Sequence, residues 1–129
     1  MNNTILVTGG AGFIGSNLCR NLLSEGHSVV AIDNFITGSR ENAAMLAAYE
    51  NFTLHEMDIT TSQFPALFDS HKFDLIFHLA CPTGVPNLKI LGEEMLAACS
   101  TGTFNVMEIA KKHGAKVLAT STAEVYGQP

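Results

Sequence analysis

The chain has 129 residues, of which 47% are apolar, and a formal net charge of −5; this length predicts a single domain with its own core. The negative charge argues against nucleic acids and anionic membranes as partners, because both attract basic surfaces. The first residues lack the pattern of a secretion signal, and no apolar run approaches the roughly 20 residues that span a bilayer, so we expect neither.

Strands and helices are predicted to alternate along the chain. Short apolar runs rich in β-branched residues predict strands at residues 4–8, 28–32, 52–57, 74–79 and 116–121. A helical pattern after residue 12 presents Ile14, Leu18 and Leu22 on one face. Further helices are predicted at about residues 40–49, 62–70 and 89–112. This alternation predicts an α/β fold with a doubly wound parallel sheet of about five strands, covered by helices on both faces.

The cysteines and histidines do not suggest a metal site. Cys19, Cys81 and Cys99 form no C-x-x-C pair and lie among small or apolar residues. We interpret them as free, buried thiols, which suits the reducing cytoplasm. His78 lies within a predicted strand and is interpreted as a core histidine rather than a ligand.

A glycine-rich segment, TGGAGFIG at residues 8–15, joins the first predicted strand to the first predicted helix. There Gly9 permits a tight turn, Gly12 a close approach of the backbone to a pyrophosphate, and Gly15 close packing of the helix on the strand. The free N–H groups and the positive end of the helix dipole then face the phosphates. This context predicts a dinucleotide site; the alternative is a glycine-rich turn in an α/β protein that binds no nucleotide.

An acidic residue follows at the position that such a site requires. Asp33 ends the second predicted strand, 18 residues after Gly15. A carboxylate there accepts hydrogen bonds from the adenosine ribose hydroxyls and repels the 2′-phosphate of NADP. Arg40 is close in sequence and can in principle accommodate that phosphate, so the sequence favours NAD over NADP without excluding NADP.

The segment TGGAGFIGSNL at residues 8–18 resembles the cofactor loop of the extended short-chain dehydrogenase/reductase family. The resemblance continues through AIDNFITGSREN (31–42), MDIT (57–60), HLACPTGVPN (78–87) and TSTAEVYGQP (120–129). This family contains NAD-dependent nucleotide-sugar epimerases, dehydratases and decarboxylases, and the last two segments look closest to the UDP-glucuronate decarboxylase and dTDP-glucose dehydratase branch. The resemblance implies a Rossmann-type NAD-binding domain over residues 1–129 and a reaction by transient hydride transfer between the sugar and NAD.

The resemblance also implies particular contacts. Cofactor contacts are expected in the phosphate loop from Gly9, Gly12, Phe13, Ile14 and Gly15, on the ribose side from Asp33, Asn34, Thr37 and Gly38, beside adenine from Asp58 and Ile59, and after the fourth strand from Leu79, Ala80 and Cys81. Thr122 matches the family's catalytic Ser/Thr, and Glu124 matches an acid that assists decarboxylases and dehydratases. The alternative interpretations are a strand-end hydroxyl for Thr122, a solvated acid for Glu124 and a packing residue for Cys81.

The chain departs from the family pattern in one large respect. The catalytic Y-x-x-x-K motif does not occur: Tyr49 is followed four places later by Thr53, and Tyr126 lies three residues from the end. In the family this motif and the sugar-binding region come later, so we expect a truncated portion of the fold that does not turn over a sugar nucleotide by itself. Ala123 stands where the decarboxylase branch commonly has Ser, and Cys99 where similar relatives carry Asn.

We therefore expect the NAD-binding portion of a cytoplasmic enzyme that acts on a nucleotide sugar. The alternatives are a stand-alone NAD-binding or regulatory module and a partial enzyme that a second chain completes. The truncation is expected to leave the outer edge of the fifth strand bare. It is also expected to uncover apolar residues of the 89–112 helix, namely Met95, Leu96, Phe104 and Met107. A homo-oligomer or marginal stability would follow.

Overall fold

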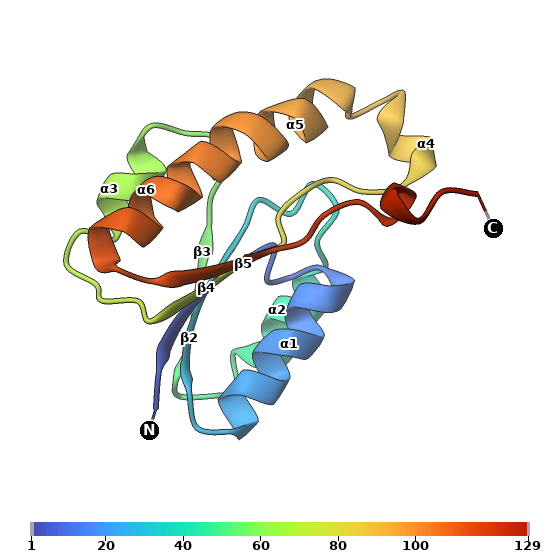
Figure 1. Ribbon diagram of the computed structural model, residues 1–129. Coiled ribbons are helices and arrows are strands. Elements are labelled where there is room, and N and C mark those ends of the chain that lie inside the picture. Colours follow the sequence, from blue (N-terminus) through green and yellow to red (C-terminus); the bar gives the residue numbers. More distant parts are fainter. Residues whose placement is uncertain (1, 129) are drawn as a thin grey trace.

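Strands and helices alternate through the computed structural model, which describes residues 2–128 (Figure 1). The strands are β1 (Thr4–Thr8), β2 (Ser28–Asp33), β3 (Phe52–Glu56), β4 (Leu75–His78) and β5 (Lys116–Ala119). The α-helices are α1 (Phe13–Ser24), α2 (Arg40–Leu46), α3 (Gln63–Leu67), α4 (Val85–Leu88), α5 (Gly92–Ala97) and α6 (Thr103–His113). A π-helical turn (Ala98–Gly102) joins α5 to α6, and a 3-10 turn (Ala123–Tyr126) follows β5.

The five strands form one parallel sheet in the order β3-β2-β1-β4-β5. From the central β1 the chain moves outward to β2 and β3, then crosses back to place β4 on the other side of β1. This reversal creates a switch point at the carboxyl ends of β1 and β4, where Thr8 pairs with His78. The loops after these two strands diverge, which is where open α/β sheets bind ligands.

The sheet separates two hydrophobic cores. α1 and α2 cover one face and α3 and α6 the other (Figure 1). Because successive strand residues point to opposite faces, β1 sends Leu6 to the α3–α6 side and Ile5 and Val7 to the α1–α2 side. The predicted doubly wound parallel sheet is therefore confirmed.

Two helical expectations were wrong in detail. In α1 the buried residues are Gly15, Ser16, Cys19 and Leu23, whereas Ile14 is 64% exposed. The glycine loop orients the start of α1 so that its small residues pack against the rest of the domain, whereas Ile14 faces solvent. The single helix expected over 89–112 is broken into α5, the π-helical turn and α6, and the separate helix α4 precedes it.

An apolar surface remains uncovered on the side of α5 and α6. Among the described residues β5 has a strand partner only in β4, so its outer edge is bare. Leu96 is 70% exposed, Phe104 65% and Met107 50%, and Met95 is partly buried. Within residues 2–128, none of the helices combines the length and the apolar character that crossing a bilayer requires.

Candidate functional site

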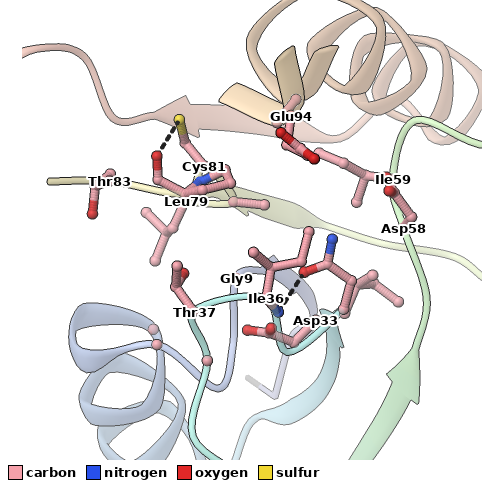
Figure 2. Close-up of a pocket in the computed structure, with 18 of the residues that line it drawn as sticks. Gly9, Asp33, Ile36, Thr37, Asp58, Ile59, Leu79, Cys81, Thr83 and Glu94 are labelled. Carbon is pink, nitrogen blue, oxygen red and sulfur yellow. Dashed lines mark hydrogen bonds between the residues drawn. The ribbon is translucent and has the colours of Figure 1, made fainter. Parts of the chain in front are cut away.

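A cavity of about 740 Å³ opens at the carboxyl edge of the sheet, over the switch point (Figure 2). Its walls come from the loops after β1, β2, β3, β4 and β5, from the first turn of α1, and from α5 with the π-helical turn. This volume falls within the usual range of small-molecule pockets. All fourteen residues expected to contact a cofactor line the cavity.

The glycine loop forms the floor of this cavity. Gly9 has φ +74, and a Cβ there would come within 3.0 Å of the Ala80 nitrogen. A Cβ on Gly15 would overlap the carbonyl oxygen of Gly9. Gly15 thus lets α1 pack closely on the loop itself, rather than on the strand as expected. No side chain in the described chain caps α1, whose extended cap residue is Gly12, so the first-turn N–H groups can bind an anion in the cavity.

Asp33 links three parts of the ribose side. Its Oδ2 accepts a hydrogen bond from the Ala11 backbone N–H at 2.9 Å, and its Oδ1 accepts one from the Phe35 N–H at 2.8 Å. A Cβ on Gly38 would lie 2.6 Å from the same carboxylate, so only glycine allows this loop to close over Asp33. The carboxylate is therefore fixed at the cavity wall, and each oxygen keeps a lone pair for a further donor (Figure 2).

Arg40, the cation nearest to this carboxylate in sequence, is already paired. Its guanidinium donates two hydrogen bonds to Glu56, at 3.0 and 2.6 Å. It also lies over the ring of Phe35, with Cζ 4.3 Å from the ring centroid. The hydrogen bond from Arg40 lowers the pKa of Glu56, so the pair stays ionised at neutral pH. Both side chains are exposed, and Arg40 does not line the cavity.

The loop after β3 closes the adenine side. Asp58 Oδ1 accepts hydrogen bonds from the backbone N–H of Thr60 at 2.8 Å and from its hydroxyl at 2.7 Å. The buried Asn105 of α6 donates its amide to the Ile59 carbonyl at 2.8 Å. Gly102 makes room for the Ile59 side chain, because a Cβ there would lie 2.5 Å from Ile59 Cδ1. Asp58 therefore shapes its own turn, and α6 fixes the whole loop.

A buried polar network holds the loop after β4, and sequence reasoning missed it. The Thr8 hydroxyl oxygen accepts hydrogen bonds from the backbone N–H groups of Leu79 and Ala80, both at 3.2 Å. Since these two bonds use both lone pairs of the hydroxyl, we assign its own proton to the hydrogen bond with His78 Nδ1, 2.8 Å away. His78 Nε2 then carries the ring proton and donates to the Thr103 hydroxyl at 2.9 Å. Burial lowers the pKa of His78, which keeps the ring neutral in this network. His78 is thus a core histidine, as expected, with a positioning role.

The charges in the cavity are all negative. Four carboxylates line it (Asp33, Asp58, Glu93 and Glu94), and no Lys or Arg does so among the described residues. Figure 2 shows Glu94 on the wall opposite Asp33. A bound phosphate would therefore be held by backbone N–H groups and the α1 dipole, because no Lys or Arg side chain of residues 2–128 lines the cavity to neutralise it.

The two residues expected to be catalytic lie outside this cavity. Thr122 and Glu124 are exposed, and the Thr122 hydroxyl accepts the Glu124 N–H at 3.1 Å to cap the 3-10 turn. Their neighbours Thr120 and Ser121 line the cavity instead. Sequence reasoning also missed Ala97 and Ala98, because nothing in their local pattern indicates that a broken helix brings them to the cavity.

The three cysteines have different environments, and the expectation that all are buried was wrong. Cys19 is buried, Cys81 is partly buried and Cys99 is exposed. The Cys81 and Cys99 sulfurs lie 3.4 Å apart. Burial and the neighbouring Cys99 raise the pKa of Cys81 to about 11. Within the described residues, no group of three His, Cys, Asp or Glu side chains is arranged to hold a metal.

Known proteins resemble this chain throughout its length. The model of the NAD dependent epimerase/dehydratase family matches residues 5–129. UDP-glucuronic acid decarboxylase 1 from Danio rerio is 40% identical over 97% of this chain and 28% of the relative. Its namesake from Arabidopsis thaliana is 42% identical over 97% of this chain and 27% of the relative. The chain thus spans between a quarter and a third of the length of these relatives.

Solved structures show the same arrangement. The UDP-Glc/GlcNAc 4-epimerase of Campylobacter jejuni superimposes with a TM-score of 0.86 at 34% identity, over 99% of this chain and 40% of that one. The Bordetella bronchiseptica enzyme WbmG, solved in complex with NAD, gives a TM-score of 0.85 at 35% identity, over 100% of this chain and 40% of that one. With its parallel sheet, glycine loop and Asp33, this chain belongs to the NAD-dependent epimerase/dehydratase family.

Proposed function

We propose that residues 1–129 form the NAD-binding domain of a cytoplasmic enzyme that modifies a nucleotide sugar. One observation carries the assignment of the site: the uncapped first turn of α1, the glycine loop and the fixed Asp33 carboxylate line one cavity. The pyrophosphate would lie against Gly12, Phe13 and Ile14, and the adenosine ribose against Asp33. Asp58 and Ile59 would flank the adenine, while Leu79, Ala80 and Cys81 would contact the middle of the cofactor.

The charges favour NAD over NADP as the ligand. A 2′-phosphate would meet the Asp33 carboxylate, and Arg40 is occupied by its two hydrogen bonds to Glu56. Four carboxylates and no cation line the cavity in the described part of the chain. The 2′-phosphate of NADP therefore gains no favourable contact, and its repulsion by the carboxylates weakens binding.

For the reaction, the relatives point to a UDP-sugar as substrate, because the decarboxylases and the epimerase named above act on such compounds. Bound NAD would accept a hydride from the sugar ring and return or keep it. Thr122 is proposed as the catalytic hydroxyl and Glu124 as an assisting acid. The chain contains no Y-x-x-x-K motif, so we propose that it does not turn over a sugar nucleotide on its own. The exposed Leu96 and Phe104 would mediate self-association.

Titration calorimetry with NAD and NADP tests the site directly. Asp33→Asn keeps the size of the side chain and removes its charge, so NAD affinity should fall about 10- to 150-fold, the range for a lost hydrogen bond to a charged acceptor. Glu108→Gln makes the same charge change on an exposed face of α6 and should bind NAD as the wild type does. Circular dichroism checks that Asp33→Asn is folded, since Asp33 also holds the Ala11 and Phe35 backbone.

A folded wild-type chain that does not bind NAD would refute the proposal, and equal affinity for NAD and NADP would refute the cofactor preference. Activity is tested by mixing the chain with NAD and UDP-glucuronic acid or UDP-glucose and following product by chromatography. We expect no product, and turnover by this chain would overturn the claim of inactivity.

A further inference from the structure

Two cysteines from separate parts of the chain meet at the edge of the cavity. Cys81 belongs to the loop after β4, and Cys99 lies in the π-helical turn between α5 and α6. Their sulfurs are 3.4 Å apart, although 18 positions separate the residues in sequence. A disulfide requires about 2.05 Å, so the sulfurs need to approach by roughly 1.4 Å. Since Cys81 lies outside every strand and helix, its loop can make this movement without breaking the sheet.

We propose that Cys81 and Cys99 form an oxidation-sensitive dithiol site, which hydroperoxides or small disulfides convert to an intrachain disulfide. The proposal concerns the thiols and does not depend on the proposed NAD binding. The third cysteine provides an internal reference: Cys19 is 0% exposed and lies in the core under α1.

The two thiols differ in their access to an oxidant. Cys99 is exposed, whereas Cys81 is partly buried and burial raises its pKa to about 11. Because the thiolate is the reactive form, Cys99 reacts first. Its sulfur attacks the O–O bond of a hydroperoxide, giving a sulfenic acid and releasing the other oxygen as water or an alcohol. The Cys81 sulfur then displaces the hydroxyl group from the Cys99 sulfur, so that the S–S bond forms, the S–O bond breaks, and the Cys81 proton leaves with the hydroxyl as water. Both thiols are oxidised, and the hydroperoxide is reduced. With a small disulfide, the Cys99 sulfur displaces one small thiol to form a mixed disulfide, and the Cys81 sulfur then displaces the second small thiol from Cys99, so the small disulfide is reduced to two thiols.

The position of the bridge gives it a consequence for the cavity. Cys81 lines one wall, and Ala97 and Ala98, which adjoin Cys99 along the chain, line another. A disulfide would fasten these walls to each other. Reduction would release them again, because Cys99 is an exposed residue that small thiols can reach.

The test exposes the folded, reduced chain to hydrogen peroxide or oxidised glutathione. Remaining thiols are then alkylated and mapped by mass spectrometry. We expect a loss of two hydrogen atoms, a peptide joined through Cys81 and Cys99, an unmodified Cys19, and full recovery with dithiothreitol. Cys19→Ser should form the same bridge. Cys81→Ser and Cys99→Ser should not, and circular dichroism checks that each variant is folded.

Three results would overturn the proposal: three free thiols after treatment that oxidises a reference dithiol, a glutathione adduct that persists on Cys99 beside a free Cys81, or bridges only between chains. Chains treated at low concentration and run on a non-reducing gel separate the intrachain bridge from the interchain one.

Discussion

Thr8 offers the sharpest test of how the cavity is held together. Thr8→Val keeps the shape of the side chain but removes the acceptor of the Ala80 N–H and the donor to His78 Nδ1. The Leu79 N–H keeps a second acceptor, the Thr8 carbonyl. Each buried group left without a partner costs about 1–3 kcal/mol, so for these two groups we expect a loss of roughly 2–6 kcal/mol in the free energy of unfolding.

The matched variant is Thr8→Ser, which keeps the hydroxyl and loses one buried methyl group. That loss costs about 1 kcal/mol, so the serine variant should be the more stable of the two. Burial of apolar surface alone would predict the reverse order, because valine is the more hydrophobic residue. Urea unfolding of both variants gives the comparison. A Thr8→Val chain as stable as Thr8→Ser would refute the network, as would NMR spectra of wild-type His78 in which Nδ1 carries the proton.

Three further predictions concern the loop, the cofactor preference and pH. Gly15→Ala places a methyl group on the Gly9 carbonyl oxygen, so we expect a lower urea midpoint and a loss of NAD binding by more than about tenfold in calorimetry. Glu56→Gln frees Arg40 from its ion pair, so NADP should bind about 3- to 10-fold more tightly relative to NAD in the same assay. His113 Nδ1 accepts the Phe73 N–H at 3.2 Å, and burial and nearby lysines lower the pKa of His113. As pH falls, His113 is therefore protonated in the unfolded chain before it is protonated in the folded chain. The contribution of His113 to the free energy of unfolding is thus largest above about pH 6.5 and is lost as pH decreases through the folded-state pKa. Urea midpoints at several pH values measure this slope.

Each of these predictions has a control. Gly92→Ala adds a methyl group where no atom lies within 4 Å, so NAD binding should persist; equal losses in both glycine variants would contradict the loop argument. Glu108→Gln is the control and should leave the ratio of NADP to NAD affinity unchanged. An unchanged ratio in Glu56→Gln would show that Arg40 does not influence the cofactor preference. His113→Asn keeps an acceptor for Phe73 but does not titrate, so its midpoint should vary less with pH; an unchanged slope would contradict the role of His113.

Local pattern predicted the sheet and the glycine loop because both depend on neighbours in sequence. The alternation of strands and helices, and the spacing from Gly15 to Asp33, can be recognised without knowledge of distant contacts. The buried face of α1 was misjudged, because Ile14 fits the helical period but the loop packs Gly15 and Cys19 inward.

Contacts across long stretches of chain could not be predicted in this way. The Thr8–His78 hydrogen bond joins positions 70 residues apart, and no local pattern encodes it. The Cys81–Cys99 contact depends on the π-helical turn, which the expected continuous helix over 89–112 did not contain. Arg40 is not available to a 2′-phosphate because it pairs with Glu56. The β2–β3 register, which places Glu56 beside Asp33, is not encoded in the local sequence.

The absence of side-chain cations from the cavity walls of the described chain has a consequence for ionic strength. Proteins that hold phosphates with Lys and Arg bind more weakly as salt rises, because salt screens attraction between opposite charges. Here backbone N–H groups would hold the pyrophosphate, while four carboxylates repel it. Added salt should therefore leave dinucleotide affinity unchanged or strengthen it slightly, since the long-range force that salt screens in this cavity is repulsive.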